Sequence, residues 1–258
     1  MKNLLKKYIP KKIINFFKKL IHMHYASYIN KNFGTGIKKY KNKYKNQRCF
    51  IIGNGPSLLI EDLEKLKNEN TFASHMIYKV FNETDWRPKF YCVEDIKLLT
   101  NNLDDLQKLC NDNAYEHGFF TGNMWKDLPN SFLKSEKNDF WYIFKLAYNG
   151  FPDFSLRPNK YLIEGYTVTY AIIQLAVYMG FTEIYLLGVD HHYEKGNNYS
   201  KSIGETEVYN IPLLDKSTLS YKKAREICEK KKIKIVNLTR GGYLETFERK
   251  SFDSVIGD

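Results

Sequence analysis

The stretch 165–193, GYTVTYAIIQLAVYMGFTEIYLLGVDHHY, constrains the fold more than any other part of the chain. Its first half is typical of a buried helix that starts at Thr167 and runs to about Met179, and Gly180 is the residue type that commonly ends a helix. The next run, Glu183–Leu187, is short and largely apolar, as the central strands of parallel sheets are. A buried helix that leads directly into a buried strand predicts an α/β fold.

A second unit of the same kind begins at residue 49 with CFIIGNGPSL. It predicts a buried strand over Cys49–Ile52, a glycine-rich turn, and a helix over Leu58–Lys67 with Ser57 as its N-cap. Such a unit opens a Rossmann-like domain, in which glycines let the backbone approach a ligand and a helix N-terminus attracts phosphate. The turn is neither GxGxxG nor a Walker loop, and a bare Gly-x-Gly turn is equally often structural. The nucleotide-binding candidates in this turn are Gly53, Asn54, Gly55, Pro56 and Ser57.

The remaining elements complete the predicted fold, a Rossmann-like, mostly parallel sheet flanked by helices. Further strands are predicted over Thr71–Tyr78, Lys89–Val93 and Ile233–Asn237, and an amphipathic helix over Ser217–Lys231. The aromatic-rich stretch 100–160 is less periodic, and we interpret it as an inserted helical lid or acceptor-side subdomain. We expect a domain over residues 48–258 that follows a separate segment, 1–47.

Carboxylates and histidines follow two of the predicted strands. Glu94 and Asp95 come directly after the strand that ends at Val93, which places them at the ligand edge of a parallel sheet. The alternative is that these acids only cap a helix. Gly188, Asp190, His191 and His192 follow the strand that ends at Leu187. The Asp-His-His sequence lacks a third metal ligand at a defined spacing, so we predict no metal site. A histidine that acts as a general base or binds phosphate fits better, and we expect His192 to be the base and Asp190 to orient the loop or a ribose.

The net charge of +11 is confined to the N-terminal segment. Residues 1–48 carry 14 of the 40 Lys and Arg and no acid, which leaves 26 bases against 29 acids in the rest of the chain. The globular part is therefore slightly acidic, and we expect no nucleic-acid partner. Four scattered cysteines without a CxxC pair indicate reduced thiols in the cytoplasm.

Residues 3–24 have the pattern of a basic amphipathic helix that lies on an anionic membrane. The apolar positions at helical spacing are Leu5, Ile9, Ile13, Phe16, Phe17, Leu20 and Ile21, and lysines fill the gaps. No apolar run is long enough to span a bilayer. The alternative is a helix packed on its own domain, so the expected location is cytoplasmic, either free or peripheral on the inner face of the cell membrane.

Three stretches together resemble a known family: IIGNGPSL, TVTYAIIQLAVYMGFTEIYLLGVDHHY and NLTRGGYLETFER. Over roughly residues 48–256 they look like the 6-hydroxymethylpterin diphosphokinase-like family of Rossmann-like proteins. The first two are also similar to family 42 bacterial sialyltransferases. The resemblance implies that Asn54, Ser57 and the residues Thr167, Val168 and Thr169 hold a nucleotide. His75 stands where both families have an asparagine after the second strand, and no histidine follows His192 to match the sialyltransferase base, which leaves His192, His191 or Glu94 for that role.

The resemblance implies a nucleotide-dependent transferase. Our leading expectation is a glycosyltransferase that uses a nucleotide-activated, CMP-linked sugar in surface-polysaccharide synthesis, with a glycan or lipid-linked acceptor and no tightly bound cofactor. The first alternative is an ATP-dependent diphosphokinase of the pterin type, with Mg²⁺ held by Glu94, Asp95 and Asp190. The second is a non-catalytic nucleotide-binding module that recruits partners to a membrane. The sequence leaves the oligomeric state open, a homo-oligomer included.

Overall fold

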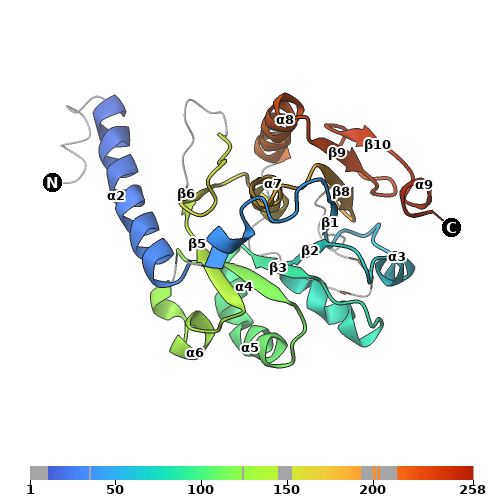
Figure 1. Ribbon diagram of the computed structural model, residues 1–258, viewed down its shortest axis with the longest axis horizontal. Coiled ribbons are helices and arrows are strands. Elements are labelled where there is room, and N and C mark those ends of the chain that lie inside the picture. The colour runs from blue at the N-terminus through green and yellow to red at the C-terminus, as the bar shows by residue number, and fades with distance from the viewer. Residues whose placement is uncertain are drawn as a thin grey trace.

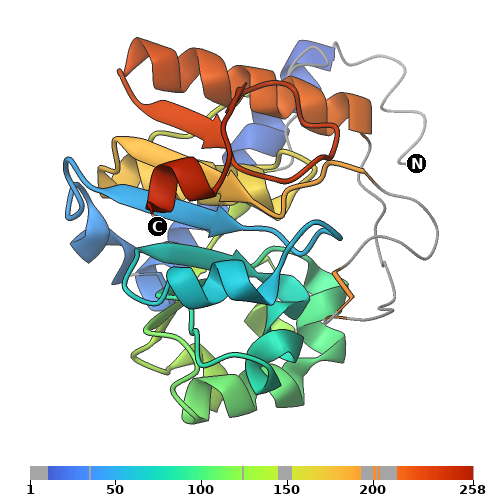
Figure 2. The same ribbon diagram turned by 90° about the vertical axis from the view of Figure 1, so that its right-hand side faces the viewer.

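A computed structural model of the chain describes residues 11–34, 36–123, 125–144, 153–192, 200–201, 203 and 214–257. Its centre is a parallel sheet whose strands all point the same way (Figure 2). The strands are β1 (Arg48–Ile52), β2 (Thr71–Ser74), β3 (Phe90–Val93), β4 (His117–Thr121), β5 (Asn138–Trp141), β8 (Glu183–Leu187), β9 (Lys234–Asn237) and β10 (Glu248–Arg249). They lie in the order β10-β9-β8-β1-β2-β3-β4-β5, and each neighbouring pair is parallel. The predicted Rossmann-like α/β architecture is confirmed.

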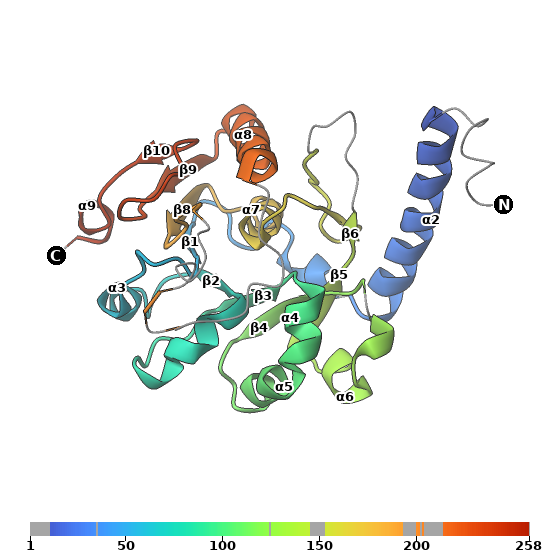
Figure 3. The ribbon, with the colours of Figure 1, turned by 180° about the vertical axis from the view of Figure 1, so that it is seen from behind.

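Helices cover both faces of this sheet (Figures 1 and 3). One face carries α7 (Val168–Met179) and α8 (Leu214–Lys230). The other carries α3 (Ile60–Lys65), the 3-10 helix η2 (His75–Asn82), α4 (Ile96–Asn101), α5 (Leu103–Asn111) and α6 (Asn130–Leu133). Shorter elements are η1 (Gly36–Tyr40), η3 (Trp125–Asp127), α9 (Asp253–Ile256) and a second, two-stranded sheet of β6 (Ile143–Phe144) and β7 (Leu162–Ile163).

The core lies between the sheet and α7. All 12 residues of α7 are buried, because this helix contacts the sheet on one side and α8 and β7 on others. That burial explains why its sequence is apolar all round. Thr167 occupies the N-cap and Gly180 ends the helix with a φ of 95°, in the left-handed region that favours glycine. This helix and β8 lie where the sequence predicted them.

Two predicted elements differ from the structure at the ends nearest the site. The helix expected over Leu58–Lys67 is only Ile60–Lys65, and Leu59 rather than Ser57 is its N-cap. Ser57 does not cap it because its hydroxyl donates to Asp190 instead. The strand expected over Thr71–Tyr78 stops at Ser74, because the next residue, His75, has a φ of 53° and turns the chain into η2.

The stretch 100–160 is not a helical insertion. Among its described residues it supplies β4 and β5 to the main sheet and β6 to the small one. Every residue of β4 and β5 is buried, and Phe119 stacks on Trp141 with ring centroids 5.9 Å apart. The stretch is aromatic because these strands are covered on both faces, which also removes the alternation expected of a half-exposed strand. Residues 145–152 lie outside the described part of the chain.

The N-terminal segment forms a helix, α2 (Lys11–Asn32), beside β5. The C-terminal part of α2 packs on the domain through the buried residues Ala26 and Ile29, and the Phe140 amide of β5 donates to the Phe33 carbonyl over 3.1 Å. Within the segment 1–47, η1 buries Ile37 and Tyr40 in the hydrophobic core. Among the described residues, no helix has the length and apolar character of a membrane span. Residues 3–10 of the predicted amphipathic helix lie outside the described part of the chain.

Candidate nucleotide site

The strand order reverses at β1. From β1 the chain builds the sheet in one direction through β2, β3, β4 and β5, and β8, β9 and β10 extend it on the other side of β1. In open parallel sheets, ligands bind outside the carboxyl ends of the strands at such a switch point. The loops that follow β1, β8 and β9 meet here, and they contain most of the residues that the sequence singled out.

Glycines allow the loops after β1 and β8 to touch. The Gly53 amide donates to the Leu187 carbonyl over 2.8 Å, and the Gly55 amide donates to the Gly188 carbonyl over 2.9 Å. A Cβ on Gly53 would collide with the Gly188 carbonyl oxygen, and a Cβ on Gly55 would collide with the Asp190 carboxylate. We expected these glycines to admit a ligand; in the structure the close approach that requires them is to the neighbouring loop.

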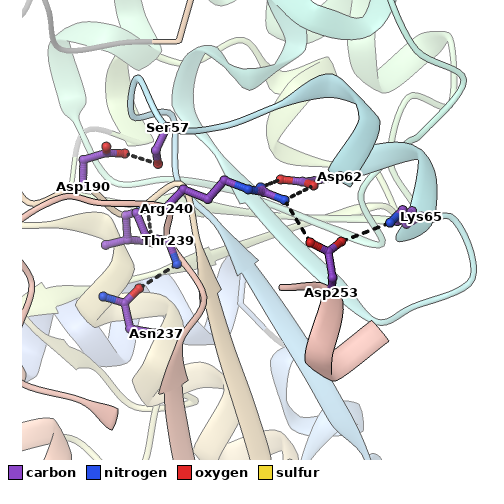
Figure 4. Close-up of polar contacts among 9 residues, drawn as sticks. Ser57, Asp62, Lys65, Asp190, Asn237, Thr239, Arg240 and Asp253 are labelled. Carbon is purple, nitrogen blue, oxygen red and sulfur yellow. Dashed lines mark hydrogen bonds and ion pairs between the residues drawn. The ribbon is translucent and has the colours of Figure 1, made fainter. Parts of the chain in front are cut away.

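Asp190 is held by both neighbouring loops (Figure 4). Its carboxylate accepts a hydrogen bond of 2.8 Å from the Ser57 hydroxyl, and its carbonyl accepts one of 2.8 Å from the Tyr243 amide. The Val189 amide donates to the Thr239 hydroxyl over 3.0 Å. Burial raises the pKa of Asp190, and hydrogen bonds from Ser57 partly oppose that rise. The carboxylate is therefore positioned between the turn after β1 and the loop after β9.

Arg240, in the loop after β9, binds two carboxylates and not a free anion (Figure 4). Both of its terminal nitrogens contact the buried Asp62 of α3, one of them at 2.9 Å from Oδ1, and Asp253 of α9 lies 3.9 Å away. These charged hydrogen bonds fix the loop after β9 to the helix after β1.

Three buried polar atoms at the ends of β1 and β2 have no hydrogen-bond partner among the described residues: Asn54 Oδ1, His75 Nε2 and Ser200 Oγ. They belong to one local network, because Asn54 Nδ2 donates to the Ser74 carbonyl over 3.0 Å and the Ser200 amide donates to the Asn54 carbonyl over 2.8 Å. Burial lowers the pKa of His75 to about 4, so its ring is neutral near pH 7. Buried polar atoms without partners are rare in folded proteins, so this group is a candidate contact for a ligand.

The two adjacent histidines lie in different surroundings. His191 is buried, its Nε2 lies 2.8 Å from the Thr218 hydroxyl, and its ring packs edge-on against Tyr221 of α8. Burial lowers the pKa of His191. His192 lies beside Tyr243, with ring centroids 4.5 Å apart, and its charge acts on Asp190. The structure thus turns His191 inward onto α8 and leaves His192 next to the carboxylate.

The remaining candidates, Asp95 and Glu94, make different contacts. Asp95 caps α4, because its Oδ1 accepts from the Leu98 amide over 3.0 Å. Glu94 has a buried carboxylate oxygen, and its charge contributes to the raised pKa of Tyr221. Burial is the main cause of the raised pKa of Tyr221, and hydrogen bonds with Thr167 and Thr169 oppose it. Glu94, the start of α7 and His191 therefore all lie around Tyr221.

Tyr221 and Ser200 were missed from the sequence. Tyr221 lies on the apolar side of an amphipathic helix, where the pattern predicts an aromatic residue to be part of the hydrophobic core. Ser200 follows no strand and belongs to no motif, so no signal identified it. In the described part of the chain, no three His, Cys, Asp or Glu side chains are grouped so that they could hold a metal ion.

The fold defines a Rossmann-like α/β protein whose candidate ligand site is the edge where β1 and β8 meet. The family model described as 6-hydroxymethylpterin diphosphokinase MptE-like matches residues 23–196. The chain belongs to this family.

A solved structure of similar fold is the MAf glycosyltransferase from Magnetospirillum magneticum AMB-1. It is 16% identical to this chain, with a TM-score of 0.51. The match covers 88% of this chain and 39% of the larger protein, so this chain spans about two fifths of its length. A search of curated proteins gave no match.

Proposed function

We propose that the chain is a nucleotide-dependent transferase that binds its donor at the carboxyl ends of β1, β2 and β8. The observation that carries this proposal is the group of three unpartnered atoms, Asn54 Oδ1, His75 Nε2 and Ser200 Oγ. The Asn54 side-chain oxygen is an acceptor, and the hydrogen bond from its amide nitrogen to the Ser74 carbonyl fixes the orientation of the amide. An acceptor requires a hydroxyl or amino group from the ligand, which a ribose or a nucleobase supplies and an ionised phosphate does not. The neutral state of His75 also fits the uncharged part of a nucleotide.

The donor that we propose is a nucleotide-activated sugar with a CMP leaving group, used in surface-polysaccharide synthesis. The supporting points are the resemblance to sialyltransferases and the similar fold of the MAf glycosyltransferase. In the transfer, the acceptor hydroxyl oxygen would form a bond to the anomeric carbon while the bond from that carbon to the CMP phosphate oxygen breaks. CMP would leave with the electron pair, and the hydroxyl proton would pass to a base.

His192 is the base that we propose. Its charge acts on the Asp190 carboxylate and its ring lies beside Tyr243, whereas His191 is buried with its Nε2 at the Thr218 hydroxyl. General-base catalysis contributes about 10²–10⁴-fold, so His192→Ala should lower kcat by about that factor and leave donor affinity nearly intact. If the His192→Ala variant keeps its full turnover, the base is another group, and Glu94 is the next to substitute.

The diphosphokinase remains the second candidate because the family description names that activity. It would need Mg²⁺ together with ATP. Two of the three acids proposed as ligands already have structural roles, Asp95 as the cap of α4 and Asp190 as the acceptor from Ser57. These contacts make the diphosphokinase the weaker of the two candidates.

Thermal shift with a panel of nucleotides tests the proposal and separates the candidates. The panel is CMP, CDP, UDP, GDP and ATP, each with and without Mg²⁺. A ligand at one hundred times its Kd stabilises the folded state by about 2.7 kcal/mol. A cytidine-specific shift without metal supports the sugar donor, and a shift with ATP that depends on Mg²⁺ supports the diphosphokinase. A shift without hydrolysis or transfer of any donor would support the non-catalytic module.

Two buried serines provide a matched pair for locating the site. Ser200→Ala removes a hydroxyl that has no partner, so the unliganded protein should lose no stability while the nucleotide shift falls. Ser155→Ala removes a hydroxyl that donates to the Tyr161 carbonyl over 2.6 Å, so stability should fall by about 1 kcal/mol while the shift is retained. A full nucleotide shift in Ser200→Ala would place the ligand elsewhere.

A further inference from the structure

The first half of α2 presents large apolar side chains to solvent. Phe16 and Phe17 are each 58% exposed and Ile21 is 56% exposed, and Ile13 and Leu20 are each 45% exposed. A globular protein rarely leaves so many large apolar groups together on one segment without a partner. They form what we call the exposed stripe of α2: Ile13, Phe16, Phe17, Leu20 and Ile21.

The exposed stripe faces away from the domain. At 3.6 residues per turn, its five side chains lie within an arc of about 140°. Ala26 and Ile29, which are buried against the domain, lie on the opposite side of the same helix. His22 Nδ1 lies 2.5 Å from the Tyr142 hydroxyl, and Asn30 Nδ2 donates to the Lys160 carbonyl over 2.6 Å. Because these contacts hold the second half of α2, the stripe cannot turn inward without breaking them.

Figures 1 and 3 show the consequence for the shape of the molecule. The second half of α2 lies near β5, while its first half extends beside the domain toward the N-terminus. The stripe is thus carried on a helix whose second half is held by the domain.

The charge of the segment indicates what covers the stripe. Residues 1–48 carry 14 Lys and Arg, and the first acid of the chain is Glu61. A second copy of this chain would bring a second, equally basic segment against the stripe, and like charges would oppose the contact. An anionic bilayer offers an apolar interior for the stripe and negative headgroups for the basic residues of the segment.

We propose that α2 docks the protein on an anionic membrane surface, with the exposed stripe inserted at the level of the headgroups and the upper acyl chains. This inference does not depend on the proposed transferase activity. It concerns a surface at the β5 end of the sheet, whereas the nucleotide site lies at the carboxyl ends of β1 and β8.

Vesicle sedimentation of the full-length chain tests the proposal. We expect binding to vesicles of phosphatidylcholine with about one third phosphatidylglycerol and at least tenfold weaker binding to pure phosphatidylcholine, because each lysine near an anionic surface contributes about fivefold. Raising NaCl from 50 to 500 mM should weaken binding by about tenfold or more, since the salt screens that attraction.

Two variants separate the stripe from apolar exposure in general. The double substitution Phe16→Ser and Phe17→Ser should weaken vesicle binding by a factor on the order of one hundred, because two aromatic side chains no longer leave water. Leu156→Ser is the matched control, since Leu156 is 44% exposed and lies outside α2, and it should bind as the unaltered chain does. Both variants should keep the melting temperature, because only exposed side chains change.

Three results would overturn the proposal. One is equal binding to neutral and anionic vesicles, which would remove the role of the basic segment. Another is unaltered binding by the Phe16→Ser and Phe17→Ser variant. The third is a dimer in light scattering that dissociates in that variant while vesicles are ignored, which would make a second copy of the chain the partner of the stripe.

Discussion

Gly55→Ala tests whether the turn after β1 and the loop after β8 form one unit. The φ of Gly55 lies outside the left-handed region, so an alanine there meets no backbone strain of its own. Its new Cβ would collide with the Asp190 carboxylate and lie 2.8 Å from the Gly188 carbonyl oxygen. To admit it, the loops must separate, which breaks the 2.8 Å bond from Ser57 to Asp190 and the 2.9 Å bond from the Gly55 amide to Gly188.

The magnitude follows from these losses. A hydrogen bond to a charged group contributes about 1.5–3 kcal/mol and a backbone bond about 1 kcal/mol. Inserting a methyl group into a packed contact costs about 1–3 kcal/mol, and part of that cost is the same bond breakage. We therefore expect the unfolding free energy to fall by about 3–5 kcal/mol, measured by urea denaturation.

The control is Gly241→Ala, in the loop after β9. Nothing lies within 4 Å of a Cβ at Gly241, but its φ is 67°, so an alanine there costs only the left-handed backbone, about 1–2 kcal/mol. If Gly55→Ala loses no more stability than Gly241→Ala, the contact between the two loops does not hold them together. A double substitution with Asp190→Ala removes the colliding carboxylate, so it should be less destabilising than the two single effects added.

Further predictions concern His75 and Arg240. His75→Asn should keep stability at neutral pH, because asparagine tolerates the φ of 53°, whereas His75→Val should lose stability in urea denaturation because a β-branched residue does not. Below pH 6.5 and down to the folded pKa of about 4, the unfolded chain binds a proton that the folded His75 does not, so the unfolding free energy should fall as the pH falls through this window. The fall attributable to this residue is on the order of 3 kcal/mol, and denaturation at pH 4.5 and 7.5 should show a smaller difference in His75→Asn. Arg240→Ala should cost about 2–4 kcal/mol because it leaves the Asp62 carboxylate buried without its partner, and adding Asp62→Leu to that variant should recover part of the loss. If Arg240→Ala melts like the unaltered chain, the Asp62 carboxylate does not depend on Arg240.

The sequence predicts the centre of this fold better than its ends. Burial on all sides makes α7 and β8 continuously apolar, and such runs are visible without knowledge of their neighbours. The turn after β1 is also visible, because its glycines stand out. The loop that these glycines contact cannot be recognised in the same way, because Gly188 lies more than a hundred residues further along the chain.

Side-chain contacts between distant elements explain the errors at the site. Ser57 has the sequence context of an N-cap, and only the approach of Asp190 turns its hydroxyl elsewhere. His75 continues a β-rich run, and its positive φ depends on the packing around it. Asp95 does cap a helix, which was the structural alternative considered for it. Local patterns therefore bring the candidate residues together at one edge of the sheet, while the contacts of their side chains depend on tertiary packing.

The two edge strands of the main sheet affect how readily the protein aggregates at high concentration. An exposed border strand offers unpaired amides and carbonyls that template edge-to-edge aggregation. At one border, the Phe33 carbonyl at the end of α2 accepts from the amide of Phe140 in β5, and a Cβ on Gly34 would lie 2.6 Å from the Phe140 carbonyl. At the other border, β10 contributes only the charged pair Glu248–Arg249. A covered border and a short, charged one give a second molecule little backbone to pair with, so edge-to-edge pairing of this sheet is disfavoured.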